Sequence, residues 1–519
     1  MTQLDARPPV EPAEPVRATA TFESLNPING DVVATHPIHG ADDVRAAVAR
    51  AQVEAAWWGA LTFDERAAHL TAWKGVITRR LAQLTEQMHR ETGKPHGDAT
   101  LEAALAIDHL AWAATHAKKH LKRRRVASGL LMANQAASVE YRPLGVVGVI
   151  GPWNYPVFTP MGSIAYALAA GNAVVFKPSE YTPGVGEWLA RTFLEAVGRP
   201  VFSVVTGLGD TGAALCRAGV DKIAFTGSTA TGKRVMAACA ETLTPVVIEA
   251  GGKDAVIVDL DADLDAAADA TLWGACANAG QTCTGVERVY VHERVYDEFV
   301  ARLVTKAKGL RADDSAGSQI GPITMPKQLD VIRAHIADAL ARGGRALIGG
   351  ADAVGERYVQ PTILVDVPED SDAVQEETFG PTMTITKVST VEEAIERTNA
   401  SKYGLGSTVF SKARGMEIAE QIRSGMTSIN SVISFAAIPS LPFGGVGDSG
   451  FGRIHGPDGL REFTYPKAIA RQRFKPVMAL TSFERTEKQD RQLVQMMTLL
   501  HGRGTTLPKL SKRGKRATK

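Results

Sequence analysis

Residues 145–151 read Gly-Val-Val-Gly-Val-Ile-Gly, and this stretch sets the interpretation of the whole chain. A short run that is apolar throughout and rich in β-branched residues is typical of a strand buried on both faces of a parallel sheet. Strands and helices alternate after it. The strand patterns cover 173–177, 202–206, 222–225, 245–249 and 255–258, and the helix patterns cover 187–197, 212–219 and 233–241. This alternation predicts a doubly wound parallel sheet, which gathers ligands at the carboxyl ends of its strands.

A second alternating unit follows Asp265. Its helix patterns cover 266–276, 295–308, 326–342 and 391–399, and its strand patterns cover 286–291, 346–348 and 382–387. Ahead of the first strand, residues 41–120 show the periodicity of amphipathic helices. The predicted fold class is therefore α/β, with two doubly wound, Rossmann-like domains.

Composition narrows the class of protein. The 519 residues suggest roughly two or three domains. A net charge of only +2 does not favour a nucleic-acid binder. The four cysteines form no CxxC pair, which fits a reducing compartment. Residues 1–20 are rich in Pro, Ala and charge, so we expect a disordered arm without the apolar core of a signal peptide. We expect a cytoplasmic enzyme, because no apolar run reaches the ~20 residues of a membrane span.

Three polar residues suggest an acyl-transfer site. Cys283 lies in Gly280-Gln281-Thr282-Cys283-Thr284, Glu249 ends an apolar strand, and Asn154 follows the strand at 145–150. A thiol, a carboxylate and an amide match a nucleophile, a general base and an oxyanion donor. The alternatives are a cysteine that only packs in the core and a glutamate that only forms a salt bridge.

Two glycine-rich turns are candidate phosphate sites. Residues 207–212 match G-x-G-x-x-G between a strand and a helix, but the acidic residue expected about twenty positions later is missing. Residues 225–232 also leave a strand and open a helix, with Ser228 and backbone N–H groups free to meet a pyrophosphate. Lys177 and Glu180 follow another strand, where they suit ribose hydroxyls; the alternative is a surface ion pair.

Together these motifs resemble the aldehyde dehydrogenase superfamily over residues 22–472. They occur in the family's order and at its spacing: PWNYP (152–156), KPSE (177–180), FTGSTATG (225–232), EAGGK (249–253), GQTC (280–283), EETFGP (376–381) and PFGG (442–445). Ala250 replaces the leucine usual in the glutamate motif, and we expect this to alter packing but not the role of Glu249.

The resemblance implies a catalytic set and a cofactor set, and no metal. Cys283 would attack the aldehyde, the Asn154 amide and the Cys283 backbone N–H would hold the oxyanion, and Glu249 would activate the water that hydrolyses the thioester. The residues implied for NAD binding are Trp153, Lys177, Ser179, Glu180, Gly207, Phe225, Gly227, Ser228, Glu377 and Phe379. Among them, Glu180 contacts the adenosine ribose in the family, and Glu377 and Phe379 lie at the nicotinamide ribose and ring.

The cofactor and the substrate class follow from the residues in these places. A carboxylate at Glu180 would repel a 2′-phosphate, so we predict NAD, with NADP as the alternative. The residues expected along the aldehyde tunnel are mostly apolar and include no arginine: Val157, Phe158, Thr159, Met161, Gly162, Val432, Phe435, Ala436, Ala437 and Ile438. This favours an uncharged aliphatic or aromatic aldehyde. The alternatives are a succinic-semialdehyde-type enzyme, a coenzyme-A-acylating enzyme, which Glu249 disfavours, and a catalytically silent binding relative.

The resemblance also implies a domain plan and an assembly. The NAD-binding domain would comprise 21–123 and 144–265, the catalytic domain 266–457, and the oligomerisation arm 124–143 and 458–472. We expect a homodimer or homotetramer. Residues 473–519 lie outside the resemblance and combine an amphipathic helix with a basic end. That tail is expected to pack on a neighbouring subunit; the alternatives are peripheral contact with an anionic membrane and nucleic-acid binding.

Overall fold

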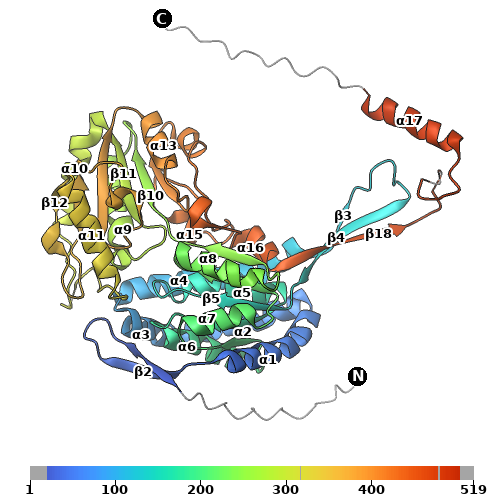
Figure 1. The fold of residues 1–519 in the computed structure, drawn as a ribbon, viewed down its shortest axis with the longest axis horizontal. Helices are drawn as coiled ribbons and strands as arrows, with labels where there is room; N and C mark the ends of the chain where they lie inside the picture. Colours follow the sequence, from blue (N-terminus) through green and yellow to red (C-terminus); the bar gives the residue numbers. More distant parts are fainter. Residues whose placement is uncertain (1–19, 316, 477, 479, 503–519) are drawn as a thin grey trace, which may run out of the picture. The chain divides into compact units, whose positions relative to one another are not determined.

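The computed structural model describes residues 20–502, apart from 316, 477 and 479 (Figure 1). The disordered arm predicted for 1–20 and the basic end of the tail therefore lie almost wholly outside the described residues. The described chain forms two compact units, one of residues 20–122 and 141–465 and one of 123–140 and 466–502. None of the described helices has the length and apolar character that crossing a bilayer requires.

The first sheet of the larger unit has the strand order β17-β9-β8-β5-β6-β7. Its strands are β5 (Val146–Ile150), β6 (Ala173–Lys177), β7 (Phe202–Val204), β8 (Lys222–Thr226), β9 (Val246–Glu249) and β17 (Gly450–Phe451). All pair in parallel except β17, which runs antiparallel to β9. The stretch at 145–151 thus forms the strand where the order reverses, between β8 and β6. The prediction of a doubly wound α/β sheet is confirmed.

Helices flank this sheet in the order that the alternation predicts. They are α1 (Ala41–Ala60), α2 (Phe63–Arg79), α3 (Leu81–Thr92), α4 (His96–Leu121), α5 (Phe158–Ala170), α6 (Pro183–Val197), α7 (Gly209–Arg217) and α8 (Thr229–Ala240). Small buried residues such as Ala99, Ala103 and Ala106 line one face of α4, which lets it pack closely on α5. A hairpin of β1 (Thr21–Leu25) and β2 (Val32–Pro37) precedes α1.

One strand belongs to a different sheet from the one predicted. We expected 255–258 to extend the first sheet, but β10 (Asp254–Val258) pairs with β11 (Val286–His292) and β15 (Ser407–Phe410) of the second sheet. The strand is apolar on both faces and so fits the interior of either sheet. What separates it from β9 is the turn at Gly251-Gly252, where the chain crosses from one sheet to the other.

The second sheet has the order β12-β13-β14-β11-β10-β15-β16. Its other strands are β12 (Arg345–Ile348), β13 (Thr362–Val365), β14 (Thr382–Val388) and β16 (Ser428–Ile429); its helices are α9 (Leu264–Cys276), α10 (Glu293–Ala307), α11 (Gln328–Ala341), α12 (Asp372–Gln375), α13 (Val391–Asn399) and α14 (Gly415–Ala419). Two later helices, α15 (Ser434–Ala437) and α16 (Gly456–Glu462), bury their apolar residues in the core of the first sheet. The sequence analysis did not predict β13, β15 or β16; each has four residues or fewer, which leaves little periodic signal, although the equally short β7, β9 and β12 were predicted.

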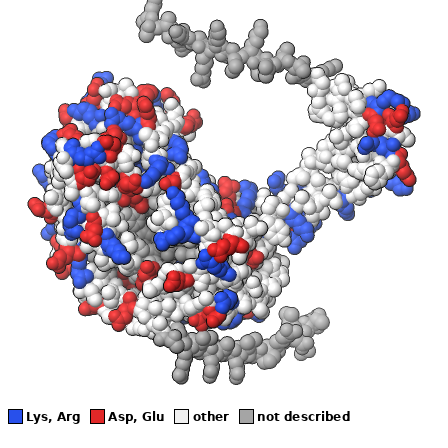
Figure 2. Space-filling model, viewed as in Figure 1, with Lys and Arg blue, Asp and Glu red and all other residues white. Residues whose placement is uncertain are grey.

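The smaller unit is a three-stranded sheet followed by a helix. The sheet has the order β18-β4-β3, with β3 (Arg124–Val126), β4 (Gln135–Pro143) and β18 (Thr464–Gln472), and the helix is α17 (Glu487–His501). The amphipathic helix expected in the tail begins with a capping box formed by Thr486 and Gln489. No side chain of α17 is buried. On the visible face of the larger unit, acidic and basic side chains are interspersed (Figure 2).

Candidate active site

Glu249, Asn154 and Cys283 come together at one cavity. Glu249 ends β9, Asn154 lies in the loop after β5, and both face the carboxyl edge of the first sheet. Cys283 belongs to the second sheet's side of the site and lies in the loop between α9 and β11. All three line a cavity of about 130 Å³. The structure therefore brings together the three residues that the sequence singled out, with the thiol supplied by the opposite sheet.

Glu249 is a buried carboxyl with no strong partner. Neither of its oxygens has a hydrogen-bond partner of good geometry among the described residues. Burial raises the pKa of Glu249 to about 7, and the nearby Cys283 thiol and Thr226 hydroxyl oppose this rise only in part. A carboxyl that titrates near neutral pH can both accept and return a proton, as a general base must.

Cys283 differs from the other three cysteines in its exposure. Cys216, Cys239 and Cys276 are buried, whereas Cys283 is half-buried. Burial of its sulfur and the neighbouring Glu249 carboxylate raise the pKa of the Cys283 thiol well above its ordinary range. The same residue also lines a second cavity, of about 80 Å³. The thiol thus lies where two cavities meet, which a cysteine that only fills the core would not do.

A hydrogen-bond network orders the loop that carries Cys283. Asn278 and Ala279 adopt left-handed backbone conformations with φ of 53° and 57°. The Asn278 amide donates to the backbone oxygens of Asn154 at 3.0 Å and Gln281 at 3.1 Å. The Gln281 side-chain oxygen accepts from the Thr324 backbone at 2.8 Å. The Asn154 amide donates one N–H to the Gln281 carbonyl at 2.9 Å, which leaves its second N–H for a ligand.

A buried ion pair that the sequence analysis missed holds the Asn154 loop. Lys94, after α3, lies 2.5 Å from Glu102 on α4, and both side chains are almost fully buried. Lys94 also donates to the Asn154 carbonyl at 2.8 Å. The other oxygen of Glu102 accepts from the backbone N–H groups of Val157 and Phe158 at 2.8 and 3.1 Å, at the start of α5. The signal in the sequence was weak, because Glu102 looks like any polar residue of a helix.

The two glycines after Glu249 make room for the site. A Cβ atom on Gly251 would lie 2.3 Å from both carboxylate oxygens of Glu377. A Cβ atom on Gly252 would lie 2.5 Å from the Cys283 carbonyl oxygen, and the Gly252 N–H donates to Glu377 at 3.0 Å. Burial and the nearby Glu287 raise the pKa of Glu377 to about 8. Glycine at 252 is therefore a geometric requirement of the assembled site, whereas a side chain at 251 would displace the Glu377 carboxyl group.

A second buried ion pair positions the loop that carries Glu377 and Phe379. Lys253 pairs with Glu287 of β11 and donates to the Thr378 hydroxyl at 3.1 Å. Glu287 accepts from the backbone N–H groups of Thr378 at 2.8 Å and Phe379 at 2.9 Å. The sequence analysis missed Glu287 as well. Its signal was a pair of adjacent charged residues, Glu287 and Arg288, inside the apolar strand pattern 286–291, where an unpaired charge would be costly.

Five of the ten residues predicted for NAD binding line the 130 Å³ cavity with Cys283. They are Glu377 and Phe379, predicted at the nicotinamide, together with Ser228, predicted at the pyrophosphate, and Trp153 and Gly227. The rings of Trp153 and Phe379 meet edge to face, with centroids 5.6 Å apart. Ser228 caps α8, so the helix N-terminus opens at this cavity. Phe225 differs from the prediction: its side chain is buried in the core and packs beneath Gly227.

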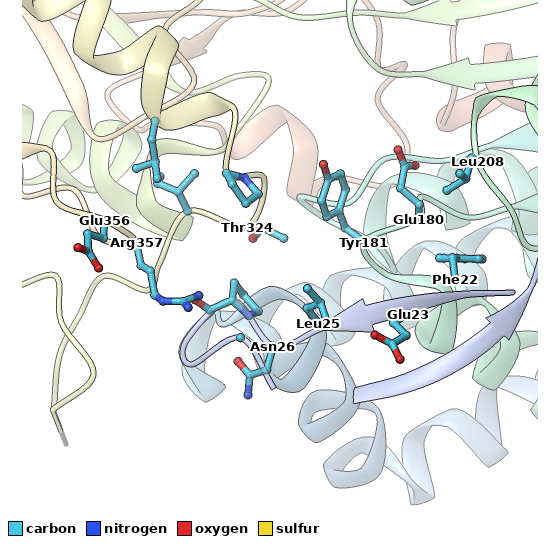
Figure 3. Close-up of a pocket in the computed structure, with 15 residues that line it drawn as sticks. Phe22, Glu23, Leu25, Asn26, Glu180, Tyr181, Leu208, Thr324, Glu356 and Arg357 are labelled. Carbon is cyan, nitrogen blue, oxygen red and sulfur yellow. The ribbon is translucent and has the colours of Figure 1, made fainter. Parts of the chain in front are cut away.

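The other residues predicted for NAD binding do not line the 130 Å³ cavity. Glu180 lines a separate cavity of about 520 Å³ together with Tyr181, Leu208 and residues of β1 (Figure 3). Lys177 is buried and lies 3.5 Å from Glu180, which is half-exposed. Ser179 donates to the same carboxylate at 3.4 Å. At Gly207, φ is +147° and a Cβ atom would strike Thr211 at 2.1 Å, so this glycine serves the turn into α7.

The 80 Å³ cavity on the other side of Cys283 is mostly apolar. Of the ten residues predicted for an aldehyde tunnel, Phe158, Thr159 and Ala436 line it. The other described lining residues are Asp98, Leu101, Glu102, Leu105, Tyr155, Trp273, Ala277, Thr282, Cys283, Thr284, Ile433 and Phe443. The prediction for Gly162 is wrong, because its missing side chain makes room for His455 and not for the cavity. No lysine or arginine lies among these lining residues.

Comparison with known proteins gives the family. The model of the aldehyde dehydrogenase family matches residues 16–469. A 4,4′-diapolycopene aldehyde oxidase of Methylomonas sp. is 36% identical over 451 residues, 86% of this chain and 85% of the relative. A benzaldehyde dehydrogenase (NAD(+)) of Pseudomonas putida is 34% identical over 458 residues, 86% and 92% of the two chains. The crystal structure of PnpE with nicotinamide adenine dinucleotide has a TM-score of 0.84 at 34% identity, covering 89% of this chain and 96% of that one. The chain belongs to the aldehyde dehydrogenase family.

Proposed function

We propose that the protein oxidises an uncharged aliphatic or aromatic aldehyde to its carboxylic acid, with NAD as the oxidant and Cys283 as the nucleophile. One observation carries the proposal: the Cys283 thiol lies at the meeting point of a cavity that contains the Glu249 and Glu377 carboxyls and a second, mostly apolar cavity. An enzyme that joins an apolar carbonyl compound to a polar cofactor through one sulfur needs this arrangement.

The described side chains provide each proton and charge that the reaction requires. Glu249 takes the proton of the Cys283 thiol, whose high pKa means that the thiolate forms only as attack proceeds. The free N–H of the Asn154 amide and the Cys283 backbone N–H stabilise the oxyanion on the attacked carbon. When bound, NAD supplies the hydride acceptor. Loss of the hydride re-forms the carbonyl and leaves a thioester on Cys283. Glu249, having released the thiol proton to solvent, then deprotonates the water that cleaves the thioester; the acid leaves, and the sulfur takes that proton back from Glu249.

The residues present fit NAD. Ser228 at the N-terminus of α8 suits a pyrophosphate, and Glu377, which needs Gly251 for its place, suits ribose hydroxyls. In the 520 Å³ cavity, Glu23, Glu180 and Glu356 provide three carboxylates against one basic side chain among its lining residues, Arg357. The Arg357 guanidinium donates to the carbonyls of Pro27 and Asn29. A 2′-phosphate would meet repulsion there, which supports NAD over the alternative, NADP.

The charge of the second cavity supports an uncharged substrate. Asp98 and Glu102 line it and no basic side chain does so among the described residues. Because Glu102 is already paired with Lys94, a substrate carboxylate, as in succinic semialdehyde, would find the Asp98 carboxyl and no basic partner. Two relatives are named for aldehydes of apolar compounds, diapolycopene and benzaldehyde. Acylation of coenzyme A and a silent binding role remain the competing functions, and Glu249 beside Cys283 disfavours both.

The first test measures NADH formation by absorbance with short aliphatic, long aliphatic and aromatic aldehydes and with succinic semialdehyde. We expect turnover with NAD, a preference for the uncharged aldehydes, and loss of at least about a thousandfold in kcat for Cys283→Ala. Cys276→Ala, which removes a buried cysteine seven residues earlier, is the matched control and should retain activity. Turnover in the Cys283 variant, or none in a wild-type protein that binds NAD, would contradict the proposal.

The oligomeric state and the cellular compartment are also proposals. We propose a cytoplasmic homodimer or homotetramer joined through the arm of 124–143 and 458–472, whose strands β3 and β18 are the two edges of a sheet. The tail helix α17 would pack on a neighbouring subunit, because its apolar side chains are not buried within its own chain. Mass photometry of the full chain gives the subunit count and would contradict the proposal if it found only monomers.

A further inference from the structure

His455 stands in a conformation that disfavours every residue but glycine. Its backbone has φ of 63° and ψ of 165°, just before α16. This region of backbone space is strained for any side chain with a Cβ atom. The imidazole is fully buried, and neither ring nitrogen has a hydrogen-bond partner among the described residues. A neutral imidazole carries one N–H donor, so its burial without an acceptor is unfavourable as well.

The ring occupies a niche that another glycine leaves open. A Cβ atom on Gly162 of α5 would lie 2.4 Å from Nε2 of His455. The ring of His109, from α4, lies 4.0 Å from that of His455, centroid to centroid. Helices α4, α5 and α16 pack against one another around this point (Figure 1). The imidazole thus fills the space where the three helices meet.

This packed ring supports the wall of the apolar cavity beside Cys283. Phe158 and Phe443 both line that cavity, and their rings lie 5.5 and 5.4 Å from the His455 ring, centroid to centroid. Behind them, Nε2 of His109 donates to the carbonyl of Ala436, another lining residue, at 3.0 Å. Burial lowers the pKa of His109 to about 4, so its ring is neutral and donates through this one N–H.

Neither protonation nor metal binding explains why the rings of His455 and His109 are buried side by side. Burial lowers the pKa of His455 well below its ordinary value, so both rings are neutral near pH 7. No group of three or more metal-binding side chains is present in the described part of the chain. What the two rings contribute is volume and rigidity behind Phe158 and Phe443.

We propose that His455 is a specificity-determining residue: its imidazole is a wedge that holds Phe158 and Phe443 against the aldehyde and so limits the width of substrate that reaches Cys283. The inference rests on the proposed function. Narrow aldehydes, straight-chain or with a single ring, fit the cavity, whereas fused-ring aldehydes are excluded by the wall that His455 supports.

The test replaces the wedge with the residue that its backbone favours. His455→Gly removes the ring and relieves the positive φ. We expect the ratio of kcat/KM for 2-naphthaldehyde to that for benzaldehyde to rise about tenfold or more, the usual range for added space in an apolar pocket. For benzaldehyde, KM rises while kcat stays within about threefold, because Cys283, Glu249 and Asn154 are untouched. Leu243→Gly is the control, since Leu243 also has a positive φ of 56° but is exposed.

A second experiment tests the niche by stability alone. Gly162→Ala should lower Tm in the wild-type background, because the new methyl group meets the His455 ring. In the His455→Gly background the same change should lower Tm much less. Equal losses in both backgrounds would show that His455 does not occupy the niche and would overturn the inference.

The outcomes separate this inference from the proposed function. An active wild type with an unchanged aldehyde ratio in folded His455→Gly overturns the wedge and leaves the proposed function intact. A wild type inactive on all aldehydes overturns the proposed function, and the specificity role falls with it, even if the Tm cycle shows that His455 fills its niche. A raised ratio together with a Tm rescue supports the wedge.

Discussion

Glu249 shows how burial sets chemistry at a single residue. Its pKa is raised to about 7 by loss of solvent, and its oxygens have no good hydrogen-bond partner among the described residues. An exposed glutamate would be fully ionised at neutral pH and a weak base. The same burial that makes Glu249 a better base also makes its charged form unfavourable for folding. Two predictions follow from these opposite effects.

The first concerns the pH dependence of turnover. A general base must be deprotonated, so we expect kcat to rise with pH and to reach half its plateau at about pH 7. Glu249→Gln should lose about 10²–10⁴-fold in steady-state rate and show no burst of NADH, because Glu249 takes the Cys283 proton before the thioester forms as well as the proton of the hydrolytic water. Stopped-flow absorbance measures the burst. A burst of about one NADH per Cys283 would show that Glu249 acts only in hydrolysis of the thioester and would contradict its role toward the thiol.

The second concerns the stability of the fold. Because the folded-state pKa lies above the unfolded value of about 4.3, Glu249 favours folding most at low pH, and this contribution is lost as pH rises through 7. We expect Glu249→Gln to raise the free energy of unfolding by about 3 kcal/mol at pH 8 and by about 1 kcal/mol at pH 5. Urea titrations at both pH values measure the difference. A gain that does not grow with pH would contradict the buried, unpartnered carboxylate.

At the scale of an element, the turn between β9 and β10 couples the two sheets to the site. Gly251→Ala would place a methyl group 2.3 Å from the Glu377 oxygens and displace that carboxylate. We expect the Kd for NAD to rise at least about tenfold, the loss of one buried hydrogen-bonded contact. Gly97→Ala in α4 is the control, since nothing lies within 4 Å of its added Cβ. Isothermal titration measures both, and an unchanged Kd for Gly251→Ala would remove Glu377 from the cofactor site.

The ion pair between α3 and α4 supports a second element, the loop of Asn154. Lys94→Met would leave Glu102 charged and buried without its partner, which costs about 3–5 kcal/mol of stability. The exposed pair Lys118–Asp64 is the matched control, and Lys118→Met should cost about 1 kcal/mol or less. Chemical denaturation compares the two variants. Similar losses in both would show that the Lys94 pair is not buried in solution.

At the scale of the whole molecule, the tail should matter for assembly and not for chemistry. Every residue of the candidate site lies in the larger unit, and α17 buries no side chain in its own chain. We expect deletion of 481–519 to leave kcat within about twofold, as for changes remote from a site, and to weaken the oligomer on dilution. Mass photometry from nanomolar to micromolar concentration tests this. An unchanged oligomer, with tail-dependent binding to anionic vesicles, would instead indicate a membrane contact.

Much of the fold and of the candidate site followed from local patterns. The apolar run at 145–151 predicted a buried strand, because burial on both faces leaves a pattern within a few residues. The structure then shows that the strand order of the sheet reverses at this strand. Cys283, Glu249 and Asn154 were identifiable because each combines a reactive group with a turn or strand end. The domain boundaries, the arm and the role of the tail stay predictions.

The sequence by itself determined which chemical groups the protein carries, and the alternation that builds two sheets, because both are properties of neighbouring residues. Only the tertiary structure decided that β10 joins the second sheet, that Lys94 pairs with Glu102 and Lys253 with Glu287, and that His455 is strained behind the apolar cavity beside Cys283. The physical reason is that sheet choice, charge pairing and burial depend on contacts between distant segments. Whether a carboxylate is an exposed charge or a base with a pKa near 7 depends on how deeply it is buried. The residues that bury it come from distant parts of the chain.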